Sequence, residues 1–149
     1  EIIDGGYWLV PPQSSCSVVI AYIGAVVPQV IESCDELNRR SPGSTAVLAI
    51  TSADRLHRGW IQAQRVRRRG SRTCRAQIEK LLSAIGSSVR IVTITDGHPS
   101  VLTWLGAVAG HRVCGLGVDR YGESGTLTEL YQAYRLDAQS ILSASLDSS

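Results

Sequence analysis

Ser124 is the first residue whose surroundings suggest a catalytic role. The stretch Gly122-Glu123-Ser124-Gly125 resembles the G-x-S-x-G turn that presents the nucleophile of serine hydrolases. Thr126 occupies the place of the last glycine, and an irregular stretch separates Ser124 from the strand predicted before it. Because the motif requires a sharp turn directly after a strand, the sequence argues against a serine nucleophile here.

Two aspartates and two histidines are the other candidates for acid–base or metal chemistry: Asp96, His98, His111 and Asp119. His98 stands at the start of a predicted helix, and His111 follows the glycine that ends it. Both places are typical of structural histidines that hydrogen-bond to helix ends. His111 and Cys114 enter a strand in which their side chains point to opposite faces, which argues against a shared metal ion.

Glycine-rich phosphate loops and cysteine sites are also incomplete. Gly115-Leu116-Gly117 begins like a dinucleotide-binding fingerprint, but Arg120 takes the third glycine position and no helix follows at once. Because the cysteines lie within or beside apolar segments and none form a C-x-x-C pair, we expect reduced, buried thiols. These are Cys16, Cys34, Cys74 and Cys114. The sequence therefore predicts no catalytic, cofactor-binding or metal-binding residue in this chain.

The most strongly charged segment is a basic run of six arginines: Arg65, Arg67, Arg68, Arg69, Arg72 and Arg75. It interrupts a helical apolar pattern, so we expect a solvated connector that is dispensable for folding; contact with an anion or a protein is the alternative. The net charge of +2 indicates neither a nucleic-acid partner nor an anionic membrane. No apolar run approaches the roughly 20 residues that span a bilayer.

The length of 149 residues, with 44% hydrophobic and 19% charged side chains, suits one domain over residues 1–149. The chain contains no methionine, even at position 1, so we expect a fragment or a processed piece of a longer chain. Reduced thiols favour a cytoplasmic location.

Strands and helices alternate along the chain. Buried strands are predicted at Ser17–Ile23, Ala46–Ile50, Val89–Ile94 and Arg112–Leu116, and a short strand in the segment Ile2–Val10. Helices are predicted after each of the first three buried strands, and another from Cys74 to Ile85. A capping box at Thr126–Glu129 predicts a further helix whose Leu127, Leu130, Tyr131 and Tyr134 face inward, and Asp137 caps the last helix. This alternation predicts a layered α/β/α domain on a mostly parallel sheet.

Three segments resemble transketolase-type thiamine-diphosphate enzymes. The stretch LGVDRYGESGTLTELYQAYRLDAQSI, Leu116–Ile141, is similar to their C-terminal signature, with Asp119, Tyr121, Gly122 and Ser124 at matching places. GGYWLV, Gly5–Val10, resembles the entry to the same domain. ITSADRL, Ile50–Leu56, is similar to the decarboxylating first component of bacterial homodimeric pyruvate dehydrogenase.

The resemblance implies a five-stranded mixed sheet whose first strand is antiparallel, in a C-terminal domain that supports and dimerises the enzyme. Thiamine diphosphate and magnesium are then expected in other domains of the same polypeptide, because the family's G-D-G and paired-asparagine motifs are missing; Asp96-Gly97 lacks the leading glycine, and Asn38 is the sole asparagine. The parent enzyme would be a homodimer, within a multienzyme complex if it is the dehydrogenase component. The alternatives are a transketolase C-terminal domain, or a free-standing regulatory domain that binds a small molecule.

If the domain holds a ligand, the family strand order implies one place for it. A switch point would lie at the carboxyl ends of the Ser17–Ile23 and Val89–Ile94 strands. The crevice would be formed by Gly24 and Ala25 on one loop and by Asp96, Gly97 and His98 on the other. The helix that begins near Ala25 would favour an anion, and His98 would add a donor. A closed, water-filled crevice is the alternative.

Overall fold

The computed structural model describes residues 4–71, 73–120, 122 and 124–147. Its five strands form one sheet in the order β1-β3-β2-β4-β5. They are β1 Gly6–Val10, β2 Val18–Ile23, β3 Thr45–Ile50, β4 Arg90–Thr95 and β5 Val113–Leu116. The strand β1 pairs with β3 antiparallel, and the other pairs are parallel. The fold class expected from the sequence, including the antiparallel first strand, is confirmed.

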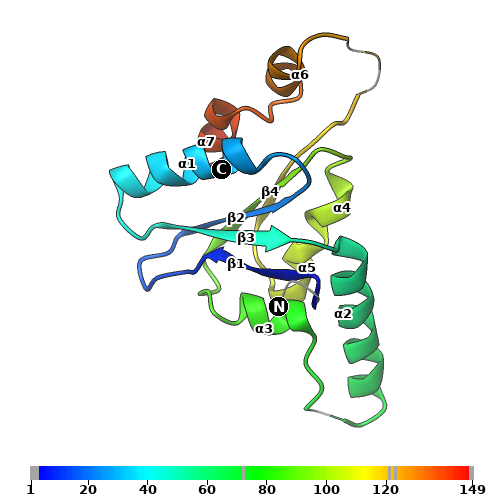
Figure 1. Ribbon diagram of the computed structural model, residues 1–149. Helices are drawn as coiled ribbons and strands as arrows, with labels where there is room; N and C mark the ends of the chain where they lie inside the picture. Colours follow the sequence, from blue (N-terminus) through cyan, green and yellow to red (C-terminus); the bar gives the residue numbers. More distant parts are fainter. Residues whose placement is uncertain (1–3, 72, 121, 123, 148–149) are drawn as a thin grey trace.

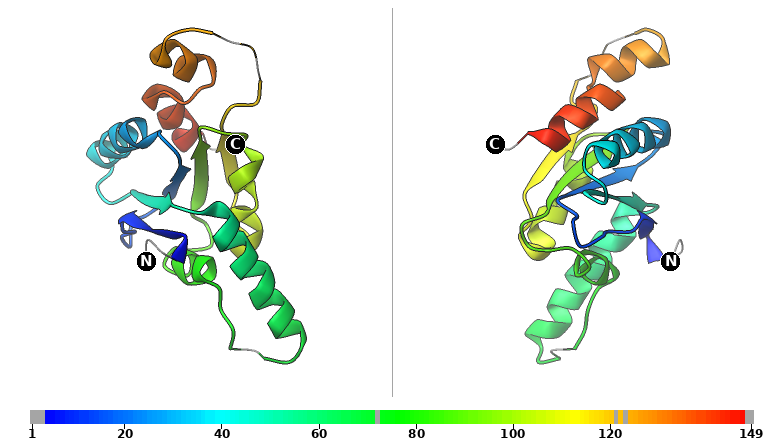
Figure 2. Two further views of the ribbon diagram at one scale, coloured as in Figure 1. Left: turned by 45° about the vertical axis from the view of Figure 1, so that its right-hand side comes forward. Right: turned by 90° about the vertical axis from the view of Figure 1, so that its left-hand side faces the viewer.

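Helices cover both faces of the sheet (Figures 1 and 2). One face carries α1 Val27–Arg40 and α7 Ala138–Leu146, and the other carries α2 Ala53–Arg68, α3 Gln77–Leu82, α4 Ser100–Thr103 and α5 Leu105–Ala109. The helix α6 Leu127–Ala133 stands beyond α7, at the end of the long connection from β5. The two layers of helices explain why β2, β3 and β4 are buried almost throughout.

Alternating side chains of the central strands supply two separate cores. Ile20 and Val92 point toward α1 and α7, where they pack with Val30 and Ile141. The intervening side chains point the other way, toward α2, α3 and α5; they include Val19, Leu48 and Ile91. Because strand side chains alternate between the faces, a continuous apolar strand fills both cores at once.

Two predicted helices are shorter than expected. Cys74 lies before α3 rather than in it, because α3 begins after Ala76, which has an extended backbone and whose N–H donates to Oε2 of Glu79 over 2.8 Å. The helix after Pro99 is divided at Trp104, whose ring stacks on Trp60 with the ring centroids 5.6 Å apart. Gly110 ends α5 in the left-handed conformation (φ 79°), as the sequence predicts.

The helix α6 buries its apolar side chains only in part: Tyr131, and Tyr134 at its end, are half-buried and pack against the core shared with α1 and α7, as the sequence predicts, and Leu130 is half-buried. Its predicted capping box forms, since the Thr126 hydroxyl accepts from the Glu129 N–H while the Glu129 carboxylate accepts from the Thr126 N–H. Leu127, however, is 66% exposed, and α6 has no buried residue. The prediction that Leu127 faces inward is wrong, because α6 is set beyond the two core layers (Figure 2).

The expectation of four buried thiols is also wrong. Only Cys34 is buried; Cys16 and Cys74 are half-buried, and Cys114 is exposed on β5 at the edge of the sheet. Burial raises the pKa of the Cys34 thiol, which keeps it protonated. All four cysteines are free. Separately, none of the helices in the described part of the chain is long and apolar enough to cross a membrane.

Candidate functional site at the carboxyl ends of β2 and β4

The strand order places a topological switch point between β2 and β4. The chain passes from β2 to β3 on one side, and later enters β4 on the other side. Ligands of open α/β sheets bind at such points, outside the carboxyl ends of the strands. The two predicted loops do meet here, because the Ala25 N–H donates to Oδ2 of Asp96 over 3.1 Å.

Asp96 occupies the position that an anionic ligand would take. The helix α1 has no side-chain cap of its own, and Val26 precedes it. The Asp96 carboxylate accepts from the Ala25 N–H, one residue before that cap position, and so lies close to the positive end of the helix. A free anion would therefore compete with an internal carboxylate for the same amide. Binding of an anion between these loops stays a prediction.

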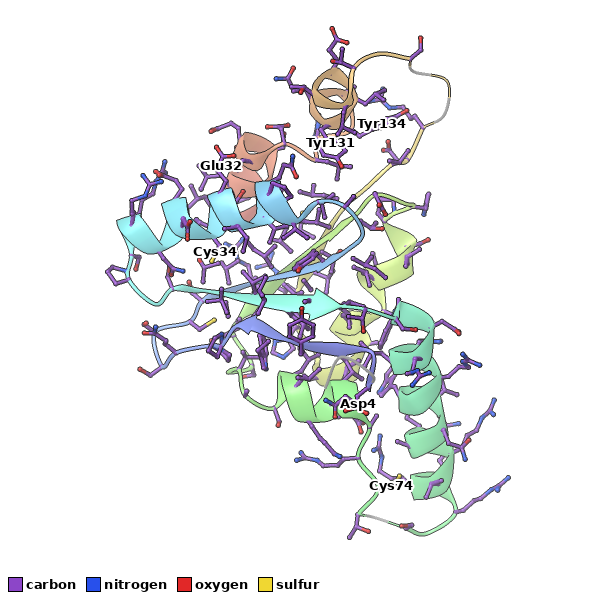
Figure 3. All side chains as sticks on the ribbon, in the orientation of Figure 1. Asp4, Glu32, Cys34, Cys74, Tyr131 and Tyr134 are labelled. Atoms are coloured by element: carbon purple, nitrogen blue, oxygen red, sulfur yellow. The ribbon has the colours of Figure 1, made fainter. Side chains whose placement is uncertain are left out.

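Gly24 permits this close approach. Its backbone has φ +96°, and a Cβ at this position would overlap the Asp96 carboxylate. Tyr131 covers the same loop from α6, since its hydroxyl donates to the Ala25 carbonyl over 3.3 Å. Figure 3 shows Tyr131 and Tyr134 on the side of α6 that faces the rest of the domain. At the switch point, Asp96 and Tyr131 thus both hydrogen-bond to the backbone of Ala25.

Gly97 and His98 are committed to the local backbone. The Gly97 N–H donates to Thr95 Oγ1 over 3.0 Å, and its carbonyl accepts from Val118. His98 Nδ1 accepts from the Ser100 N–H over 3.2 Å and lies 2.7 Å from the Ser100 hydroxyl. The expectation that His98 bonds to a helix end is confirmed, since Ser100 begins α4. His111 bonds instead to the Val89 carbonyl before β4, so that part of the expectation is wrong.

These residues do not fit a magnesium–thiamine-diphosphate site. The carboxylate of the Asp96-Gly97 pair accepts from a backbone amide of its own chain. In the described part of the chain, no three His, Cys, Asp or Glu side chains gather as metal ligands would. The residues of these two loops therefore do not form the kind of binding site that this cofactor needs.

The residues that match the family signature lie on the connection between β5 and α6. Asp119 lies 3.6 Å from the Arg120 guanidinium, and Ser124 is exposed. Gly122 has φ +103°, and a Cβ there would meet nothing within 4 Å. The backbone conformation, rather than close packing, is therefore what favours glycine at this position. Tyr121 lies outside the described residues.

Sequence reasoning missed an ion pair within the basic run. Arg65, Arg67 and Arg68 belong to α2, and the Arg67 guanidinium binds both carboxylate oxygens of Glu79, over 2.9 and 2.6 Å. It also donates to the Cys74 carbonyl over 2.7 Å. Arg67 holds the pKa of Glu79 below its ordinary value. The prediction of a wholly solvated connector is wrong, because Arg67 joins the end of α2 to α3.

Comparison with known proteins gives structural relatives only. No family model matches the chain, and neither does any curated protein sequence. The chain is similar in structure to transketolase from Campylobacter jejuni (TM-score 0.65, 15% identity) and from Leishmania mexicana (TM-score 0.60, 13% identity). The matches cover 95% of this chain but only 18% and 17% of those chains.

A third relative is a split-gene transketolase in an inactive β4 tetramer, at a TM-score of 0.64 and 16% identity. The match covers 95% of this chain and 41% of that one. At such identities the likeness is one of fold. This chain therefore has a transketolase-like C-terminal domain fold, with a five-stranded mixed sheet between two layers of helices.

Proposed function

We propose that this chain is the C-terminal structural and dimerisation domain of a thiamine-diphosphate enzyme of the transketolase type. One observation carries the proposal: 95% of this chain matches a transketolase, yet the match covers only 18% of that enzyme. The remaining domains of the same polypeptide would hold the cofactor and magnesium and would perform the chemistry. Residues 1–149 would contribute rigidity and contact surface to that enzyme.

The exposed helix α6 supports a role within a larger assembly. It is well capped but has no buried residue, and Leu127 is 66% exposed. Val27, at the start of α1, is 38% exposed. Helices of globular domains are mostly stabilised by packing an apolar face rather than by capping alone. Under the proposal, another domain of the parent enzyme, or its second copy, covers α6.

Two substrate classes remain for the parent enzyme. The segments Gly5–Val10 and Ile50–Leu56 resemble the pyruvate dehydrogenase component, which favours a 2-oxo acid as substrate. The solved relatives are transketolases, which favours a transketolase instead. We place the 2-oxo acid first, in a homodimer that serves a multienzyme complex.

Reconstitution tests the proposal and separates the two classes. The chain is mixed with the separately expressed catalytic domains of its parent reading frame, together with thiamine diphosphate and magnesium. We expect cofactor-dependent turnover of pyruvate only when both parts are present. Turnover of a ketose phosphate instead would assign the domain to a transketolase. Full activity of the catalytic domains without this chain would contradict the structural role.

A further inference from the structure

A cavity of about 440 Å³ lies far from the switch point, at the amino ends of β4 and β5. Its lining comes from the end of α2, the α2–α3 connection, α3 and the end of α5, and includes Ser87 before β4 and His111 before β5. Figure 3 marks this region by Cys74, in the connection beside the lower end of α2. The volume falls within the roughly 300–1,000 Å³ of small-molecule sites. Nothing in the proposed structural role uses this cavity.

His111 is a buried polar side chain in the cavity wall. It is 6% exposed, and its Nδ1 lies 2.9 Å from the Val89 carbonyl oxygen. A carbonyl only accepts hydrogen bonds, so Nδ1 carries the hydrogen. In the described part of the chain, no residue hydrogen-bonds to the other ring nitrogen, Nε2. The backbone thus fixes the ring and leaves Nε2 as a recognition group.

The cavity also holds one uncompensated positive charge. Arg67 and Glu79 neutralise each other through two hydrogen bonds. Arg75 lines the same cavity, and its charge acts on Glu79 without a hydrogen bond or ion pair to any residue that the structure describes. Its guanidinium is therefore free to bind an oxyanion, for which its planar donors are suited.

We propose that this cavity binds a small phosphate ester. The phosphate oxygens would accept hydrogen bonds from Arg75 and the Ser87 hydroxyl. A further hydrogen bond would join His111 Nε2 to a phosphate oxygen. The organic part would lie against the apolar side of the lining, formed by Leu82, Ile85 and Val108. This inference does not depend on the proposed function, because it concerns groups at the opposite end of the sheet.

Backbone amide NMR of the 149-residue chain tests it. Inorganic phosphate and glycerol 1-phosphate are titrated at constant ionic strength, with succinate as the carboxylate probe. We expect saturable shifts at Ser83, Ser87 and His111 with both phosphates, tighter for the ester, and weaker binding of succinate. The absence of saturable shifts with both phosphates would overturn the proposal. Tighter binding of succinate than of phosphate would overturn the ligand class.

Three variants locate the binding groups. Arg75→Gln should weaken phosphate binding about tenfold, as expected for one charge-assisted hydrogen bond. Arg69→Gln removes the same charge from the same basic run outside the cavity lining, and should leave binding unchanged. His111→Asn keeps an amide donor for the Val89 carbonyl but removes Nε2, and should also weaken binding. An equal effect of Arg69→Gln and Arg75→Gln would contradict a specific site, even if His111→Asn fails to fold.

Discussion

Gly24 has a backbone conformation that residues with a side chain rarely adopt, and it lies against a carboxylate. With φ +96° and no room for a Cβ beside Asp96, Gly24→Ala should lower the free energy of unfolding by about 1–3 kcal/mol. Urea unfolding measures this value. Gly59→Ala is the control, because a Cβ within α2 would meet nothing within 4 Å. It should leave the protein unchanged or more stable by up to about 1 kcal/mol. Equal effects of the two substitutions would contradict this account of Gly24.

The Glu79 carboxylate accepts three hydrogen bonds, two from the Arg67 guanidinium and one from the Ala76 N–H. The Glu79 side chain is 15% exposed. Glu79→Ala should therefore lower the free energy of unfolding at pH 7 by about 1–2 kcal/mol, after allowance for solvent screening. Chemical denaturation provides the measurement. Glu36→Ala is the matched control, because Glu36 also pairs with two arginines but on an exposed helix face, and it should have a smaller effect. A larger effect at Glu36 would refute the role given to Glu79.

The ion pair between Arg67 and Glu79 predicts that the free energy of unfolding depends on pH. Arg67 lowers the pKa of Glu79 in the folded state, so the folded chain binds this proton less readily than the unfolded chain. The stabilisation is present above the pKa of glutamate in the unfolded chain, about 4.3, and is lost as the pH falls through the lower folded value. The difference in unfolding free energy between the wild type and Glu79→Ala should thus be constant near neutral pH and shrink in acid. A difference that grows in acid would reverse the sign and contradict the pairing.

The ion pair between Arg67 and Glu79 could not be predicted from the sequence. Six arginines of the basic run look alike in the sequence, and Glu79 lies twelve positions after Arg67. Which arginine has a partner depends on the path by which the α2–α3 connection returns α3 to the end of α2. In contrast, the pairing of Ala25 with Asp96 across 71 positions follows from the strand order, once the family resemblance supplies that order.

At the scale of elements, the strands of this chain are easier to predict than its helices. Continuous β-branched segments such as Val18–Ile23 indicate strands buried on both faces, and the structure agrees. The apolar pattern of α6 correctly predicts that Tyr131 and Tyr134 face the core, but it does not distinguish them from Leu127, which is exposed. The division of the helix at Trp104 has no sequence signal either, because neither glycine nor proline stands at that position.

Substitutions of two leucines, Leu127 in α6 and Leu136 just after it, distinguish packing within the chain from packing against another domain. Leu127→Ser should change the free energy of unfolding by less than about 0.5 kcal/mol, because the side chain is 66% exposed. Leu136→Ala should cost about 2–5 kcal/mol, because Leu136 is 1% exposed in the core shared with α1 and α7. Thermal and urea unfolding of both variants give these values. A large loss with Leu127→Ser would mean that Leu127 itself is packed against its own chain in solution.

At the scale of the whole molecule, the central claim is that this chain works as one part of a larger enzyme. The mixed sheet and its helices match transketolases over 95% of the chain, while at the switch point Asp96 and Tyr131 of the same chain hydrogen-bond to the Ala25 backbone. The helix α6 packs against this chain through Tyr131, while Leu127 is left exposed; under the proposal, another domain covers Leu127.

Hydrogen exchange tests this claim most directly. The amides of α6 are followed in the chain alone and after addition of the catalytic domains of its parent enzyme. We predict fast exchange of α6 in the isolated chain and strong protection in the complex, with α1 protected in both. Leu127→Ser should weaken the complex while the isolated fold stays intact. Unchanged exchange at α6, together with magnesium-dependent binding of thiamine diphosphate by the isolated chain, would contradict the account.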